Sequence, residues 1–164
     1  MVVTMKKLFL TISFSLWALL GMNHVCLAEQ NSVYQVEVQA DFDVTYKKVY
    51  EALENNRLFV VFEVDIGANL ANFGSKWKDY NINKLDRIKS MVFCNGWYAN
   101  QVSNADPGML ALCPLHITMT HKDGITNVLF VRPDMVAKGS KAEAVAKDLT
   151  RDVIKAINEG LEKK

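Results

Sequence analysis

The stretch "LCPLHITMTHKDGITNVLFV", residues 112–131, holds two runs of alternating side chains that are joined by Asp123-Gly124. An Asp-Gly pair between two such runs is the strongest short-range signal for a β-hairpin, because both turn positions require positive φ. We therefore predict a strand over residues 112–121 and its return strand over residues 125–131. Pro114 cannot donate to a ladder, so we expect this end of the strand at an edge or before pairing begins.

Three further segments upstream have the period of two that is typical of strands. In residues 58–66, five apolar side chains point to one side, whereas Glu63 and Asp65 leave on the other. Such a segment predicts a strand with one dry and one solvated face. The predicted strands before the hairpin cover residues 33–38, 58–66 and 87–94.

Capping residues indicate where helices begin. Asp43 precedes apolar residues at helical spacing that end near residues 55–56, and Asn95 can cap a short helix over residues 96–104. Ser140 and Glu143 form the pattern of a capping box before a long amphipathic helix.

The remaining segments are read as connections. Residues 67–83 predict a long excursion with one helical turn near residues 69–73, and Asp106-Pro107-Gly108 has the order of a type II turn. The predicted order is βαββαββα. Hairpin and meander connections predict an α+β domain with a mainly antiparallel sheet and helices packed on one face.

The N-terminus has the pattern of an export signal. Lys6 and Lys7 precede an apolar run of residues 8–20, and Ala28 offers a small residue for cleavage before Glu29. This run is shorter than the roughly 20 residues that a membrane-spanning helix needs. We therefore expect residues 1–28 to be a cleaved secretory signal peptide, residues 29–164 to form a single domain, and the mature protein to reside in the periplasm or to be secreted without a stable membrane anchor.

The charge balance excludes one class of partner. The chain has 19 basic and 18 acidic residues, and residues 1–28 contain two of the lysines and no acidic residue, so the mature chain carries a net charge of −1. Nucleic-acid binding draws most of its affinity from neutralised phosphates, so no nucleic-acid partner is expected. The sequence likewise contains no polybasic run for a lipid surface.

Cys94 and Cys113 are the only cysteines beyond the predicted signal peptide. Outside the reducing cytoplasm, two cysteines in one small domain most often form a structural disulfide, which here would stabilise the fold by about 3 kcal/mol by the chain-entropy estimate. Their Cα atoms would then have to lie within about 7 Å of each other.

A metal or haem site is the second interpretation of the cysteines. Thiolate and imidazole ligands suit zinc, copper or haem iron, and the candidates are Cys94, Cys113, His116 and His121. In a strand, however, Cys113 and His116 point to opposite faces. Only a break at Pro114 would bring them together.

A reactive thiol is the third interpretation. Cys94 immediately precedes the predicted helix cap Asn95, and the positive end of a helix dipole favours a thiolate. No catalytic triad can be read from the spacing, so no enzyme class is assigned. Arg132 and Asp134 are expected to form a surface ion pair.

The order of several short motifs resembles the domain of unknown function 302 family. These motifs are Phe93-Cys94-Asn95, Ala105-Asp106-Pro107, Leu112-Cys113-Pro114, the Asp123-Gly124 hairpin and Arg132-Pro133. The resemblance spans roughly residues 33–161, with Gly96 in place of the usual proline and a reversed Pro-Cys order at residues 113–114. It implies a compact antiparallel sheet with packed helices and a homodimer, and it supplies no reaction.

Three functional hypotheses follow. The first is an exported binding or accessory module for an unidentified protein or small molecule, attached to a redox or electron-transfer system, with a pocket near Cys94, Asn95, Trp97, Cys113 and His116. The second is a thiol-based redox switch or enzyme centred on Cys94. The third is a structural dimer with a Cys94–Cys113 disulfide.

Overall fold

A single antiparallel sheet organises the chain in a computed structural model, which describes residues 31–163. The five strands lie in the order β1-β5-β4-β3-β2, and every neighbouring pair is antiparallel. The α+β class and the antiparallel sheet are therefore confirmed. The strands are β1 (Val33–Gln39), β2 (Phe59–Asp65), β3 (Arg87–Cys94), β4 (Leu115–Lys122) and β5 (Ile125–Val131).

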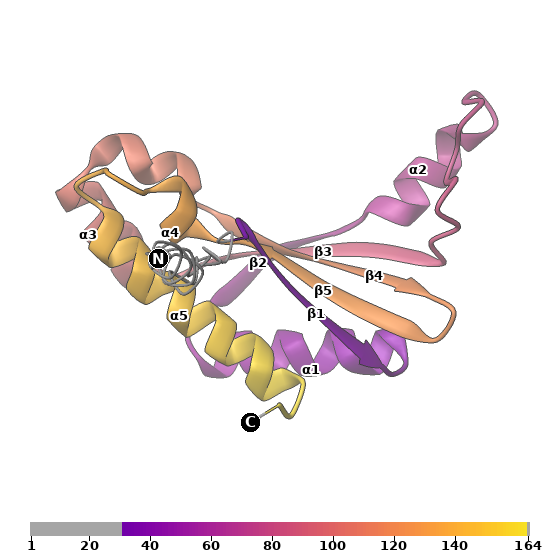
Figure 1. Cartoon of the computed structure of the whole chain (residues 1–164), viewed down its shortest axis with the longest axis horizontal. Helices are drawn as coiled ribbons and strands as arrows, with labels where there is room; N and C mark the ends of the chain where they lie inside the picture. The colour runs from indigo at the N-terminus through magenta and orange to yellow at the C-terminus, as the bar shows by residue number, and fades with distance from the viewer. Residues whose placement is uncertain (1–30, 164) are drawn as a thin grey trace, which may run out of the picture. The chain divides into compact units, whose positions relative to one another are not determined.

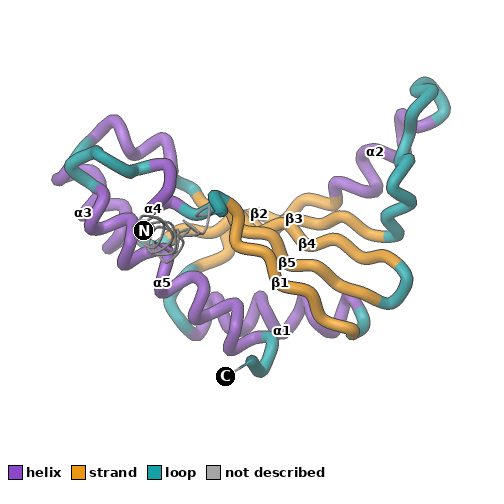
Figure 2. The backbone as a smooth tube through the Cα atoms, viewed as in Figure 1, coloured by secondary structure: helices purple, strands orange, loops and turns teal. Residues whose placement is uncertain are grey.

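The two longest helices cover one face of this sheet (Figures 1 and 2). They bury the apolar side chains that alternate along the strands, among them Met91, Phe93 and Ile117, none of which is exposed. No helix in residues 31–163 combines the length and the apolar content that crossing a bilayer requires. The helices are α1 (Phe42–Asn55), α2 (Ile66–Gly74), α3 (Gly96–Ala105), α4 (Pro133–Val136) and α5 (Glu143–Gly160), with a 3₁₀ helix, η1 (Pro107–Leu112), between α3 and β4.

The hairpin and the short helix match their predictions closely. Asp123 and Gly124 both have positive φ, as the turn requires, and they join β4 to β5. Asn95 caps α3 by accepting a hydrogen bond of 3.1 Å from the backbone N–H of Tyr98. The strand β4 begins at Leu115 rather than 112, which leaves Pro114 outside the ladder.

Two helix starts differ from their predictions. The cap of α1 is Asp41, whose side chain accepts from the Val44 amide, and Asp43 lies in the first turn. The predicted capping box does not form, because α5 begins at Glu143 itself. Instead the Glu143 carboxylate accepts from the Gly139 amide at 2.7 Å.

Two connections were also predicted incorrectly. The predicted turn after Asp106 is the start of η1, because Asp106 caps the 3₁₀ helix and Pro107 stands at its first position, where a missing N–H costs nothing. The single turn expected near residues 69–73 is the nine-residue helix α2.

A bulge in β2 overturns the predicted dry face of that strand. Val60 pairs with Phe93 and Phe62 pairs with Val92, so Val61 is an extra residue that moves the later side chains to the other face. Phe62 is consequently 61 % exposed, on the sheet face away from α1 and α5. The sequence pattern alone cannot reveal such an insertion, because the alternation continues through it.

Helices α1 and α5 approach each other closely at Gly160. A Cβ atom at this position would lie 2.8 Å from the Cα atom of Val49 and 2.9 Å from the carbonyl oxygen of Lys48, both in α1. These neighbours are backbone atoms that cannot rotate away. Only glycine therefore permits this crossing.

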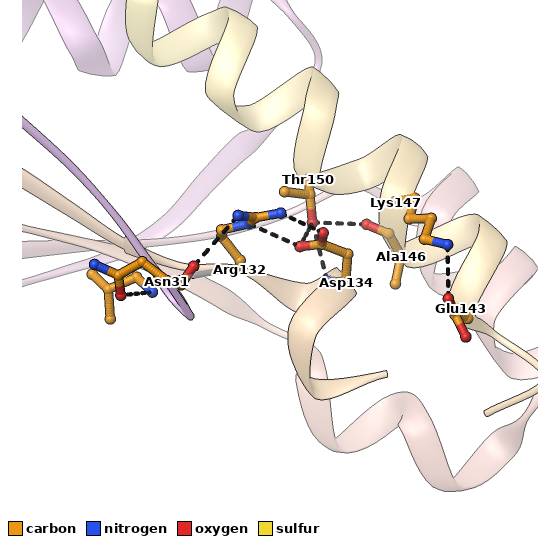
Figure 3. A network of polar contacts seen from close by, with 8 residues as sticks. Asn31, Arg132, Asp134, Glu143, Ala146, Lys147 and Thr150 are labelled. Atoms are coloured by element: carbon orange, nitrogen blue, oxygen red, sulfur yellow. Dashed lines mark hydrogen bonds and ion pairs between the residues drawn. The ribbon is translucent and has the colours of Figure 1, made fainter. Parts of the chain in front are cut away.

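A network of polar contacts fixes α5 to the end of β5 (Figure 3). Arg132 binds Asp134 with two hydrogen bonds, the shorter of 2.7 Å, and the Thr150 hydroxyl accepts from the Asp134 amide at 3.1 Å. The predicted ion pair is present, but it is mostly buried, with side-chain exposures of 26 % for Arg132 and 12 % for Asp134. Burial opposes ionisation of Asp134, but the hydrogen bonds from Arg132 and Thr150 and the Arg132 charge outweigh it, so the pKa of Asp134 lies below its usual value.

We expect Gly160→Ala to lower the free energy of unfolding by about 1–3 kcal/mol, because the new methyl group overpacks the crossing of α1 and α5. Urea denaturation measures this change. Gly96→Ala is the matched control, since a Cβ atom at residue 96 would meet nothing within 4 Å. Equal loss in both variants would contradict the close approach at Gly160.

We expect Asp134→Asn to lower the free energy of unfolding at pH 7 by about 1–2 kcal/mol, because it removes a buried charged acceptor. The depressed pKa makes this contribution complete above the unfolded pKa of about 3.9 and lost as the pH falls through the folded pKa. In urea titrations from pH 7 to pH 2.5, the difference between the two proteins should therefore narrow as the pH falls. Asp148→Asn, at an exposed ion pair with Arg151, should change little at any pH.

Candidate functional site

The connection between β3 and β4 brings the two cysteines together. Cys94 is the last residue of β3, and Cys113 is the C-cap of η1, just before β4. The ladder between these strands pairs Phe93 with Leu115, so the chain leaves and re-enters the sheet at neighbouring positions. Cys94 and Cys113 accordingly line the same cavity, at the end of the sheet where α3 begins.

This cavity is small and mostly apolar. Its volume is about 10 Å³, close to the minimum for one water molecule by this measure. Such a space excludes haem or another organic cofactor, because sites of that kind occupy hundreds of Å³. The lining residues are Leu58, Phe93, Cys94, Asn95, Tyr98, Cys113, Leu115 and Leu149.

Both cysteines are free, partly buried thiols, so the structural disulfide that we expected is not formed in this structure. Burial raises the pKa of the Cys113 thiol, and the nearby Cys94 raises it further. Cys113 therefore carries less thiolate than an exposed cysteine does at neutral pH.

The predicted metal ligands are not brought together. His121 lies at the opposite end of the β3–β4 ladder, where it pairs with Arg87, six residues or about 20 Å from the Phe93–Leu115 pair. Its Nδ1 atom is 2.9 Å from the Thr126 hydroxyl oxygen. Within residues 31–163, no three cysteine, histidine or acidic side chains gather as a metal ion would require. The structure therefore does not bring these four residues to one place.

Two of the predicted binding residues lie outside the cavity. His116 pairs with Val92 across β3 and β4, and its side chain is exposed on the sheet face away from α1 and α5. Trp97 is 61 % exposed on α3 and packs edge-on against Tyr98, with ring centroids 4.8 Å apart. Asn95 lines the cavity as predicted, and it also donates from Nδ2 to the carbonyl oxygen of Arg57 at 2.9 Å.

Three residues that are not among the predicted site residues also contribute to this site. Tyr98 is buried and donates its hydroxyl hydrogen to Asp152 of α5, while Leu149 of α5 closes the cavity. Burial and the hydrogen bond to Asp152 both raise the pKa of Tyr98, so its phenol stays protonated at neutral pH. These contacts join α3 to α5 across a gap of 54 residues, which a local pattern cannot reveal.

A second cavity lies at the base of α2. Its volume is about 320 Å³, and it contains no cysteine or histidine. Three polar side chains around it have partners within the chain: Asp65 caps α2, Asn81 forms hydrogen bonds with both backbone groups of Leu85, and Arg87 binds Asp43. It is therefore separate from the thiol site.

Comparison with known proteins supports the fold. The family model described as "Domain of unknown function DUF302" matches residues 34–160. A crystal structure of an uncharacterized conserved DUF302 protein from Bacillus stearothermophilus is similar, with a TM-score of 0.68 and 17 % sequence identity over 78 % of this chain and 97 % of that chain. No curated protein matches the chain.

We expect Cys113 to react slowly with iodoacetamide at pH 8, because burial and the neighbouring Cys94 keep its thiol protonated. Cys94→Ser should lower the pKa of Cys113 without returning it to the usual value, since burial remains. Peptide mass spectrometry of alkylation rates between pH 7 and pH 10 measures this shift. An unchanged pH profile for Cys113 in the variant would mean that the two thiols do not interact.

Proposed function

The chain belongs to the DUF302 family, and we propose that it is an exported accessory module whose binding surface is switched by oxidation of Cys94 and Cys113. The observation that carries this proposal is that the two free thiols line one cavity too small for any organic cofactor. The predicted signal peptide, residues 1–28, lies outside the described residues. Export would place the pair in a compartment where thiol–disulfide chemistry operates.

The proposed reaction is thiol–disulfide exchange with the disulfide of a partner protein or small molecule. The Cys94 thiolate attacks one partner sulfur, which forms a mixed disulfide and releases the other sulfur as a thiolate. The Cys113 thiolate then attacks the Cys94 sulfur, which forms the Cys94–Cys113 bond and releases the partner's second thiolate. Two electrons pass to the partner, and the two cysteine protons end on the partner thiolates or in solvent.

The two cysteines have different roles in this scheme. The raised pKa of Cys113 makes it the poorer initial nucleophile, so we assign the first attack to Cys94. Cys94 directly precedes Asn95, the N-cap of α3, whereas Cys113 is the C-cap of η1. A bond between the cysteines would join the two ends of the segment that contains α3 and η1.

The surface governed by this bond would include Trp97. Its ring is largely exposed on the first turn of α3, three residues after Cys94, and it rests on Tyr98. Exposed tryptophan side chains are favourable anchors for protein partners. The hydrogen bond to Asp152 holds Tyr98 in place, so a shift at the start of α3 would move the Trp97 ring relative to Tyr98.

The homodimer implied by the family likeness remains a proposal, and the sheet face away from α1 and α5 is the surface that we assign to it. This face carries apolar side chains where a solvated sheet carries polar ones, including Phe62 and Val131, which are 61 % and 43 % exposed. Five strands of about seven residues span roughly 550 Å², against about 800 Å² per partner in a standard interface. Additional contacts beyond the sheet would therefore be needed.

We expect Cys113→Ser to accumulate a mixed disulfide at Cys94 when it is incubated with oxidised glutathione, because the resolving thiol is gone. The wild-type protein should instead form the internal disulfide, and Cys94→Ser should react much more slowly. Intact-protein mass spectrometry under denaturing acid conditions distinguishes these products. Equal modification of both single variants, or wild-type protein that keeps two glutathione adducts, would refute the switch.

A further inference from the structure

Helix α2 and the chain after it form an arm, residues 66–86, that leaves the sheet at the end where β2 stops and β3 begins. Figure 1 shows this arm rising on the side of the sheet away from α1. It begins where Asp65 caps α2 by accepting from the Ala68 amide at 2.8 Å. The arm returns to the sheet at Arg87, the first residue of β3.

Internal contacts hold the arm in shape. Gly74 lies directly against the Tyr80 ring, where a Cβ atom would come within 2.9 Å. Asn81 accepts from the Leu85 amide and donates to the Leu85 carbonyl, both at 2.9 Å. The arm is thus ordered by its own contacts, and its outward side chains do not belong to the hydrophobic core.

Large apolar side chains gather at the tip of the arm. Ile82 is 73 % exposed, Phe73 and Trp77 are 49 % exposed, and the Phe73 and Trp77 rings stack with centroids 6.0 Å apart. The core lies elsewhere, between the sheet and α1 and α5. The stacked and exposed rings of Phe73 and Trp77 form an apolar group of the kind that marks an interaction surface.

The charges at the tip indicate the kind of partner. Residues 75–84 contain three lysines, Lys76, Lys78 and Lys84, and one acidic residue, Asp79, in a chain whose remaining charges nearly cancel. None of these lysines takes part in an ion pair among the described residues. The Lys76 ammonium lies 5.5 Å from the Phe73 ring centroid, so apolar and cationic groups share one surface.

We propose that this tip binds the surface of an anionic lipid bilayer, although its three lysines are too few to form a polybasic run in the sequence. Aromatic rings with adjacent lysines suit the bilayer interface, where rings enter the headgroup region and ammonium groups stay with lipid phosphates. A protein partner would need a matching acidic and apolar surface. A bilayer requires only exposed aromatic rings with adjacent lysines, which the tip presents. Lipid binding would be a property separate from the redox function proposed above.

A full-length variant with Trp77 as its single tryptophan tests this proposal directly, because residue 77 then reports its own environment independently of residues 1–28. The variant carries Trp17→Phe and Trp97→Phe. Vesicles of phosphatidylcholine and phosphatidylglycerol in a 7:3 ratio should shift its emission to shorter wavelengths, and brominated lipid should quench it. Pure phosphatidylcholine should have a much smaller effect.

Two controls separate the tip from the rest of the chain. The variant that keeps only Trp97 should show no shift, since α3 is outside the arm. Adding Lys76→Gln and Lys78→Gln to the Trp77 variant should weaken binding about 25-fold, or about fivefold per lysine, and salt should weaken it further. Circular dichroism verifies that each variant is folded.

Two results would overturn the lipid proposal. The first is an unchanged Trp77 emission with anionic vesicles, or an equal response to pure phosphatidylcholine. The second is an emission already shifted without lipid in a protein that sediments as a dimer, which would mean that a second copy covers the tip. Neither result bears on disulfide exchange at Cys94, so this proposal and the redox proposal fail independently.

Discussion

The antiparallel register between β3 and β4 is the constraint on which the site depends. Phe93 and Leu115 are paired, so the residues that follow β3 and precede β4 must be neighbours, whatever the chain does between them. Directly opposed residues in such a ladder have Cα atoms about 4.5–5.5 Å apart. Continuing the register beyond Phe93 and Leu115 would place Cys94 opposite Pro114, so Cys94 and Cys113 are near neighbours without being directly opposed. The 18 residues from Asn95 to Leu112 can therefore form α3 and η1 without separating Cys94 from Cys113.

This register is in turn fixed by burial on one face of the sheet. Met91, Phe93, Ile117 and Met119 all point toward α1 and α5 and are fully buried. A slip of one residue would turn these side chains to the opposite face and bring polar neighbours such as Thr118 into the core. The same apolar packing that stabilises the fold therefore sets the relation between the two thiols.

The sequence predicted the parts of the fold that depend on local patterns. Asp123-Gly124 located the hairpin, and Asn95 located the start of α3, because each residue satisfies a turn or cap by itself. The β2 bulge at Val61 was missed, because it is set by pairing with the distant strand β3. The start of α5 at Glu143 was missed, because the Glu143 carboxylate binds the Gly139 amide instead of forming the capping box with Ser140.

The site was predicted only in part for the same reason. Cys94, Asn95 and Cys113 line the cavity, since the hairpin-like path of the chain brings them there. His116 was placed correctly on the opposite face from the buried residues of β4, and it does not line the cavity that the two cysteines share. The contacts of Tyr98 with Asp152 and Leu149 were not predicted, because they join α3 to α5.

The proposed switch requires that the two thiols act as one redox couple. The most direct measurement is the equilibrium state of each cysteine across a series of glutathione redox buffers, read by alkylation and peptide mass spectrometry. We expect Cys94 and Cys113 to be oxidised together in one reversible two-electron transition that yields an internal disulfide in a single chain. Independent oxidation of the two cysteines, or disulfides formed only between chains, would contradict it.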